Sequence, residues 1–291
     1  MGNFRRTMLF MPGNNPGMLQ DAAILGADSI ILDLEDAVSL TEKDSARILV
    51  RDAIKYIDYS QVEVVVRVNP LDTEFGALDV DMIARVKPDT LLVPKADVEG
   101  IRLIDTLLDK IEAEEGFSAG GIKIMALIET AAGLENVSNV IQASKRVVGV
   151  LLGGEDLTSD MGIIRTKEGG EIFYARNKVA TACRAFKVDS IDTPFTDTND
   201  YEGLAKDTAN AKSLGLTGKS AINPRQIEVI HSVFAPTETE IKHALRILDA
   251  QEEAKKEGKG VFSLDGKMID APVINRAETT VELARRLGLL D

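Results

Sequence analysis

The chain has few of the side chains that form covalent cross-links or soft-metal sites. Its 291 residues include one cysteine, Cys183, two histidines and no tryptophan. A single cysteine excludes an internal disulfide and a zinc site built from several thiolates, and it fits a reducing compartment. The histidines, His231 and His243, lack the i,i+4 spacing of a helical metal-binding pair. Any metal site is therefore expected to use oxygen ligands.

Long apolar runs and positive charge are also scarce. No run approaches the roughly 20 residues of a membrane-spanning helix. Pro12 and Gly13 interrupt the short apolar stretch near the start before it could form a signal-peptide core. The formal net charge of -13 argues against a nucleic-acid partner and against an anionic membrane surface, since both need a basic face. We expect a cytoplasmic protein with neither kind of partner.

What the chain does have is a regular alternation of short strand-like runs and helical patterns. Eight runs of strand length recur at spacings of roughly 30 residues, the length of a βα unit. They cover residues 7–11, 29–34, 62–68, 90–93, 122–128, 147–152, 188–191 and 217–222. This pattern predicts an α/β fold, a (β/α)8 TIM barrel. An open doubly wound sheet would favour a G-x-G-x-x-G turn after the first strand, and residues 11–17 lack it.

The barrel should end near residue 234, giving a catalytic domain at residues 1–234 and an extension at 235–291. Residues 237–240 open a helix with a capping box, and Asp265-Gly266 predict a type I′ turn in a hairpin. Pro272 then begins a last helix. This helix–hairpin–helix is too small for an independent domain, so we expect it to pack on the barrel or to reach a neighbouring subunit.

Two acidic residues end two of the apolar runs. Glu129 follows residues 124–128, and Asp156 follows residues 147–155. The carboxyl ends of barrel strands converge on one mouth, so both carboxylates are expected there. Each alone could cap a helix or pair with a nearby cation. Together they predict a site for a hard divalent cation, with Mg2+ favoured and Mn2+ as a substitute.

Arg67 lies at the end of an otherwise apolar strand, where an unpaired charge would be costly. It could fork to a substrate carboxylate or to Glu35 or Asp36. The neighbouring run 32–38 places Asp33, Glu35 and Asp36 around one strand end, and three carboxylates so close need a cation nearby. We favour substrate binding for Arg67.

Three further residues near predicted strand ends or turns have two interpretations each. Lys95 and Lys219 could form a Schiff base with a carbonyl substrate, although a salt bridge or an anion contact is more common for a lysine. Asp270 stands two residues before Pro272, which favours a helix N-cap when the residue is considered alone.

Seven segments together resemble the HpcH/HpaI aldolase and citrate lyase family, and the similarity covers nearly the whole chain. They are Met8-Leu-Phe-Met-Pro-Gly13, Leu32-Asp-Leu-Glu-Asp-Ala-Val38, Val66-Arg-Val-Asn69, Leu127-Ile-Glu-Thr130, Gly153-Gly-Glu-Asp-Leu157, Gly218-Lys-Ser-Ala-Ile-Asn-Pro-Arg-Gln-Ile227 and Gly266-Lys-Met-Ile-Asp-Ala-Pro272. Many relatives that use coenzyme A carry histidine where Asn223 stands, so this residue favours a thioester on a carrier protein.

The resemblance implies a TIM barrel with Mg2+ held by Glu129 and Asp156. It implies that Arg67 binds the substrate carboxylate and that Asp270 enters the active site of an adjacent subunit. This reverses the interpretation of Asp270 as a mere cap. It also implies a homo-oligomer built from trimers, working beside an acetyl-transferring α-subunit and an acyl carrier γ-subunit.

The activity expected from this resemblance is cleavage of a (3S)-citryl thioester to an acetyl thioester and oxaloacetate. Asp270 would protonate the enolate, and Glu35 or Asp36 would take the hydroxyl proton. One alternative is a lyase for malyl-, citramalyl- or citryl-CoA. Others are a Schiff-base aldolase using Lys95 or Lys219, and a barrel that serves only as a scaffold for partner subunits.

Overall fold

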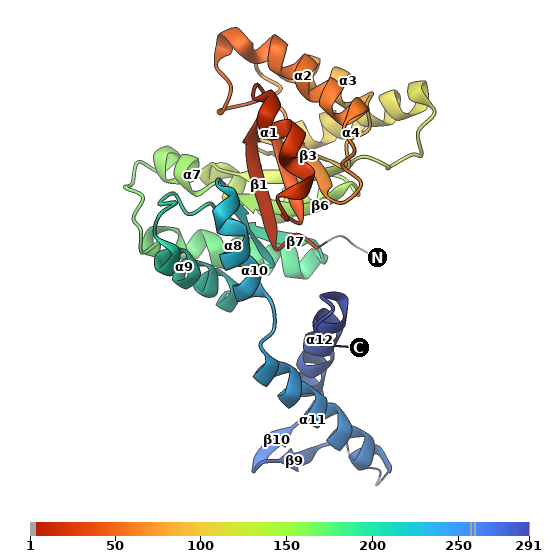
Figure 1. Cartoon of the computed structure of the whole chain (residues 1–291), viewed down its shortest axis with the longest axis vertical. Helices are drawn as coiled ribbons and strands as arrows, with labels where there is room; N and C mark the ends of the chain where they lie inside the picture. Colours follow the sequence, from red (N-terminus) through yellow and green to blue (C-terminus); the bar gives the residue numbers. More distant parts are fainter. Residues whose placement is uncertain (1–3, 257, 259, 291) are drawn as a thin grey trace. The chain divides into compact units, whose positions relative to one another are not determined.

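A closed parallel barrel forms most of the molecule (Figure 1). The computed structural model describes residues 4–256, 258 and 260–290. Each barrel strand pairs in parallel with the next, and the last closes onto the first. The strands are β1 (Thr7–Pro12), β2 (Ser29–Asp33), β3 (Glu63–Arg67), β4 (Thr90–Val93), β5 (Lys123–Ile128), β6 (Val147–Leu152), β7 (Asp189–Asp192) and β8 (Gly218–Ala221). The predicted TIM barrel is confirmed, and the runs at 90–93 and 147–152 match β4 and β6 to the residue.

Helices connect the strands and cover the outside of the barrel. They are α1 (Pro16–Asp21), α2 (Lys43–Tyr56), α3 (Gly76–Ala84), α4 (Val98–Glu115), α5 (Ala131–Glu135), α6 (Val137–Gln142), α7 (Gly154–Asp160), α8 (Phe173–Phe186), α9 (Tyr201–Ser213) and α10 (Ile227–Phe234). Helix α4 shows how the local sequence sets the ends and the buried face of a helix. It begins at the N-cap Asp97, ends at Gly116 with φ 70, and buries Ile101, Ile104 and Leu108 on one stripe.

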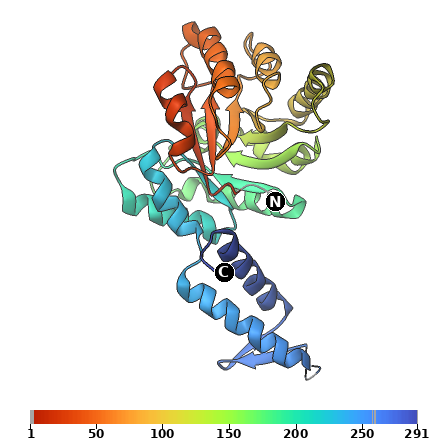
Figure 2. The ribbon, with the colours of Figure 1, turned by 45° about the vertical axis from the view of Figure 1, so that its right-hand side comes forward.

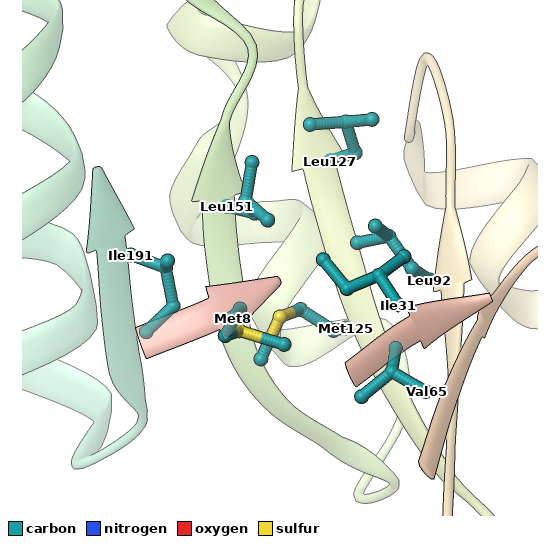
Figure 3. Packing of buried hydrophobic residues seen from close by; sticks show 8 residues of the cluster. All are labelled: Met8, Ile31, Val65, Leu92, Met125, Leu127, Leu151 and Ile191. Atoms are coloured by element: carbon teal, nitrogen blue, oxygen red, sulfur yellow. The ribbon is translucent and has the colours of Figure 1, made fainter. Parts of the chain in front are cut away.

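The barrel interior is filled by apolar side chains from seven of the eight strands. They are Met8, Ile31, Val65, Leu92, Met125, Leu127, Leu151 and Ile191, all at most 2% exposed. These side chains point toward one another inside the barrel (Figure 3). The interior is thus a packed core. The next inward-facing residues toward the carboxyl ends of the strands form the floor of any site at the barrel mouth.

The chain divides into two compact units, residues 1–231 and 232–291, and the division falls inside α10. The second unit consists of α11 (Glu238–Lys256), β9 (Phe262–Leu264), β10 (Lys267–Ile269) and α12 (Ala271–Arg286), with α11 and α12 side by side (Figure 2). The division lies three residues before the expected boundary at 234. The domain roles assigned from the sequence stay predictions.

The local signals of the second unit are confirmed. The Thr237 amide donates to Glu240 Oε2 at 2.7 Å and the Glu240 amide donates to Thr237 Oγ1 at 3.2 Å, which is a capping box. Asp265 and Gly266 have φ 52 and 77, as a type I′ turn requires. No helix in the described ranges is long and apolar enough to span a membrane.

Candidate functional site

One layer of side chains above the barrel core forms a pocket at the carboxyl ends of the strands. Side chains alternate along a strand, so the residue two positions after an interior side chain also faces inward. Six such residues line a pocket of about 360 Å³: Phe10, Asp33, Arg67, Glu129, Gly153 and Thr193. Each follows a member of the interior core by two positions. The pocket is therefore a continuation of the barrel packing in which four of the six positions carry polar side chains.

Arg67 is held on several sides by groups of the barrel mouth. Its Nε and Nη2 donate to the two carboxylate oxygens of Asp33 at 2.7 and 2.6 Å, and the two residues are register partners on β3 and β2. Its Cζ lies 5.1 Å from the centre of the Phe10 ring, a cation–π distance. Burial alone would lower the pKa of Arg67, but Asp33 raises it, so the guanidinium stays charged. The two-nitrogen contact of Arg67, which we expected a substrate carboxylate to make, is thus made by Asp33.

The third nitrogen of Arg67 faces the two candidate bases. Nη1 lies 2.8 Å from Glu35 Oε2 and 3.3 Å from Asp36 Oδ2. Glu35 is 6% exposed, and burial raises its pKa to about 8 even though the Arg67 charge opposes the rise. The Asp36 side chain is 62% exposed and lines the pocket. Of the two predicted bases, Asp36 has the better access to a ligand.

Glu129 is fixed in the floor of the pocket. It is 2% exposed, and its Oε1 accepts a hydrogen bond from the Lys95 amide at 2.6 Å. Burial raises the pKa of Glu129 to about 7, and the charge of Asp156 adds to the increase. The charge of Asp156 thus disfavours ionisation of the buried Glu129, and a bound cation would relieve this repulsion.

Asp156 lies in the first turn of α7 and is exposed. Glu129 and Asp156 line the same pocket, as the sequence predicts for strands that end side by side. Their oxygens are donors that Mg2+ accepts, and Mg2+ is often held by one or two carboxylates with water and substrate completing the shell. No cluster of three or more His, Cys, Asp or Glu side chains with metal-binding geometry occurs among the described residues.

The remaining candidates lie outside the pocket floor. Lys219 is fully buried, and its Nζ donates to Asp192 and Asp207, both at 2.6 Å. Together with Arg176, these residues form the β7–β8 cluster. Asp270 belongs to the second unit, where its side chain caps α12 by accepting from the Val273 amide at 3.3 Å. The cap interpretation is confirmed, and the role at an adjacent subunit stays a prediction.

The sequence argument missed Phe10, Gly153 and Thr193 as pocket residues. In β1 and β6 apolar residues stand at successive positions, and in β7 polar residues fall on both faces, so the pattern did not reveal which face points inward. Period-two counting from an interior residue would have found all three, because each follows a core side chain by two positions. The signal existed, but it needed one known inward-facing position per strand.

Comparison with known proteins places the chain in a family. Residues 6–224 match the family described as HpcH/HpaI aldolase/citrate lyase. The chain is 46% identical over 288 residues to the citrate lyase subunit beta of Leuconostoc mesenteroides subsp. cremoris, covering 99% of this chain and 95% of that protein. It is 33% identical over 296 residues to the mitochondrial citramalyl-CoA lyase of Homo sapiens, covering 96% of this chain and 85% of that protein.

A solved structure extends the likeness to three dimensions. The CitE protein of Mycobacterium tuberculosis, in complex with magnesium, acetoacetate and coenzyme A, matches with a TM-score of 0.82 at 28% identity. The match covers 98% of this chain and 99% of that one. The family resemblance carried by the sequence motifs is confirmed. This chain belongs to the HpcH/HpaI aldolase/citrate lyase family.

Proposed function

We propose that this carbon–carbon lyase is the β-subunit of a citrate lyase, which cleaves a (3S)-citryl thioester to an acetyl thioester and oxaloacetate. The observation that carries the proposal is the pairing of Glu129 and Asp156 with Arg67 in one pocket. A tricarboxylic substrate needs both a cation and a guanidinium to neutralise its charge. The likeness to the Leuconostoc citrate lyase subunit beta supports this choice of substrate.

Glu129 and Asp156 are the proposed ligands of Mg2+, with Mn2+ as a substitute. The Glu129 carboxylate fits this role because it lines the pocket floor, where burial raises its pKa to about 7 and a bound cation would favour its ionised form. A bound Mg2+ supplies acidity to the substrate hydroxyl and neutralises the adjacent carboxylate. The magnesium complex of the Mycobacterium tuberculosis CitE protein supports the choice of metal.

The chain's own residues would move the protons. Asp36, exposed at the pocket, accepts the proton of the tertiary hydroxyl, with Glu35 as the buried alternative. The hydroxyl oxygen becomes the ketone oxygen of oxaloacetate. The bond that breaks joins the carbinol carbon to the methylene carbon next to the thioester. The electron pair of that bond passes to the thioester enolate. Arg67 would bind a substrate carboxylate through Nη1, which contacts Glu35 and Asp36 and not Asp33, so the substrate would replace one of those two contacts.

The last step needs a proton donor at the enolate carbon. We assign this role to Asp270 of a neighbouring subunit, as the family resemblance implies, so the active unit would be a homo-oligomer built from trimers. The proposed partners are an α-subunit and a γ-subunit that carries the thioester on an acyl carrier protein. The cytoplasm is the proposed location.

The main alternative is a lyase for citryl-, malyl- or citramalyl-CoA. The mitochondrial citramalyl-CoA lyase and the coenzyme A complex of the CitE protein favour it. Asn223, where many relatives that use coenzyme A carry histidine, favours the carrier protein. A Schiff base at Lys219 has less support, because its buried Nζ donates to two carboxylates and to the Thr193 carbonyl.

One assay tests the proposal against its alternatives. Rates with citryl-carrier protein, citryl-CoA and malyl-CoA are measured with Mg2+ and with a chelator. We expect the highest kcat/KM for citryl-carrier protein and no turnover in chelator. Faster cleavage of malyl-CoA or citryl-CoA would favour the coenzyme A alternative, and full activity in chelator would reject the metal mechanism. Borohydride trapping of substrate on the protein would indicate a Schiff base.

A further inference from the structure

Lys95 has an unusual backbone conformation at the end of β4. Its φ is 45, in the left-handed region that residues other than glycine rarely adopt. Within the described ranges, three other such residues occur, Lys87, Lys187 and Asp265. Lys187 ends α8, Asp265 forms the hairpin turn, and the Lys87 amide donates to Ala84 just after α3. Lys95 alone among the four lies at the carboxyl end of a barrel strand, next to a buried carboxylate.

This conformation aims two successive amides at β5 and the residue that follows it. The Lys95 amide donates to Glu129 Oε1 at 2.6 Å, and the Ala96 amide donates to the Leu127 carbonyl at 3.1 Å. The Lys95 side chain is exposed. Such strain costs about 1–3 kcal/mol and persists where the surrounding structure enforces it. Here its visible result is a short hydrogen bond to one oxygen of Glu129.

Gly153 lies against the other oxygen of the same carboxylate. A Cβ at this position would stand 2.8 Å from Glu129 Cβ and 3.1 Å from Glu129 Oε2. Contacts this short require Glu129 to move, because its Cβ is not the free end of a flexible side chain. The Gly153 amide is itself fixed, since it donates to the Ile128 carbonyl at 2.9 Å. The space beside Glu129 exists only because Gly153 has no side chain.

We propose that Lys95 and Gly153 are positioning residues that hold the Glu129 carboxylate in its metal-binding orientation, Lys95 through its backbone amide and Gly153 through its missing side chain. This inference rests on the proposed role of Glu129 as a metal ligand. Groups that orient a metal ligand commonly change metal affinity by about 10–100-fold when they are altered. The Lys95 side chain has no part in this arrangement.

Binding of Mn2+ alone, measured by electron paramagnetic resonance of the free ion, tests the inference without substrate. Lys95→Pro removes the amide, and Gly153→Ala fills the space beside Glu129. We expect each to weaken Mn2+ binding at least about tenfold. Lys95→Gly keeps the amide and adopts positive φ without strain, so its dissociation constant should stay within about threefold of the unmodified chain.

Lys187 supplies the matched control, because it is a lysine with φ 58 at the end of α8. Lys187→Pro should leave Mn2+ affinity unchanged even if it lowers the melting temperature as much as Lys95→Pro does. Circular dichroism checks that each variant is folded. Gly153→Ala gives an answer even if Lys95→Pro does not fold, since it leaves the β4 turn intact.

The outcomes separate this inference from the proposed function. If Glu129→Gln binds Mn2+ as tightly as the unmodified chain, the metal role of Glu129 fails, and the positioning role with it. If Glu129→Gln loses binding but Gly153→Ala does not, the positioning role of Gly153 is rejected and the metal site stands. If Lys95→Gly loses as much affinity as Lys95→Pro, the side chain matters and the backbone role is wrong.

Discussion

Two groups of charged side chains in the barrel differ in their balance of charge. The β7–β8 cluster pairs two cations, Arg176 and Lys219, with two buried carboxylates, Asp192 and Asp207. The group around the pocket, here called the mouth cluster, has one guanidinium and five carboxylates. Its members are Asp33, Glu35, Asp36, Arg67, Glu129 and Asp156.

The pKa values follow this difference. Burial alone would raise the pKa of Asp207, but Lys219 and Arg176 hold it below its usual value. In the mouth cluster burial dominates, and the pKa values rise to about 8 for Glu35 and about 7 for Glu129. A balanced cluster is complete and stabilises the fold. An unbalanced one is costly without a ligand, which is the electrostatic sign of a binding site.

The largest expected effect is on catalysis at the mouth. In Glu129→Gln the amide oxygen can still accept from the Lys95 amide, but one negative ligand is lost. We expect kcat/KM to fall about 10⁴-fold, or about 5 kcal/mol, while the melting temperature does not decrease. Steady-state kinetics and thermal denaturation of the same preparation measure both quantities. A large loss of stability instead would mean that this carboxylate is structural.

The β7–β8 cluster should respond in the opposite way. Lys219→Met leaves Asp192 and Asp207 with a single cation, and removing one partner of a buried ion pair costs about 3–5 kcal/mol. Urea denaturation measures the free energy of unfolding. Adding Asp207→Asn removes the surplus charge and should recover part of the loss. If Lys219→Met loses less than about 1 kcal/mol, the contrast between the clusters is not supported.

A smaller effect concerns the ring beside Arg67. Phe10→Leu removes the cation–π contact, which is worth about 0.5–2 kcal/mol. We expect KM to rise about threefold to tenfold with little change in kcat, and Phe10→Tyr to restore most of the affinity. Phe117→Leu removes another cation–π contact, to Lys87 at 5.4 Å, and serves as the control. An equal effect of Phe117→Leu on KM would remove the special role of Phe10.

Much of the barrel and part of its site follow from the sequence. Most of the strands are rich in apolar residues because they are buried on both faces, and a polar residue at or just beyond the strand end marks the mouth. That logic predicted that Glu129, Asp156 and Arg67 meet. This prediction succeeds because the carboxyl ends of all strands in a parallel barrel lie on the same side. Which residues come together there therefore follows from the strand order alone.

The sequence could not predict which groups pair within the mouth. Asp33 was one of three nearby carboxylates, and only the β2–β3 register puts it directly opposite Arg67. The role of the Lys95 amide depends on a φ of 45, which no residue type at this position signals. Asp270 was predicted to act at an adjacent subunit, and the contacts within its own chain show only that it caps α12.

A further expected effect is on stability against pH, and it has opposite signs in the two clusters. Glu129 has a folded pKa of about 7 against an ordinary value of 4.5, so the folded chain binds more protons between these values. The free energy of unfolding therefore falls as pH rises through this range, and Glu35 extends the fall to about pH 8. Asp207, with a lowered pKa, stabilises the fold above 3.8 and loses that effect only as pH falls below it.

Denaturation in chelator at pH 5, 6.5 and 8 measures this slope. We expect a loss of about 1–2 kcal/mol across the range after allowance for solvent screening. Glu129→Gln should flatten the slope, and Glu278→Gln, the same change at an exposed position of α12, should not. Added Mg2+ should also flatten it, because a bound cation favours the ionised carboxylate at every pH. A slope that is the same in Glu129→Gln and in the unmodified chain would show that the mouth carboxylates carry no excess charge, and the two clusters would then be alike.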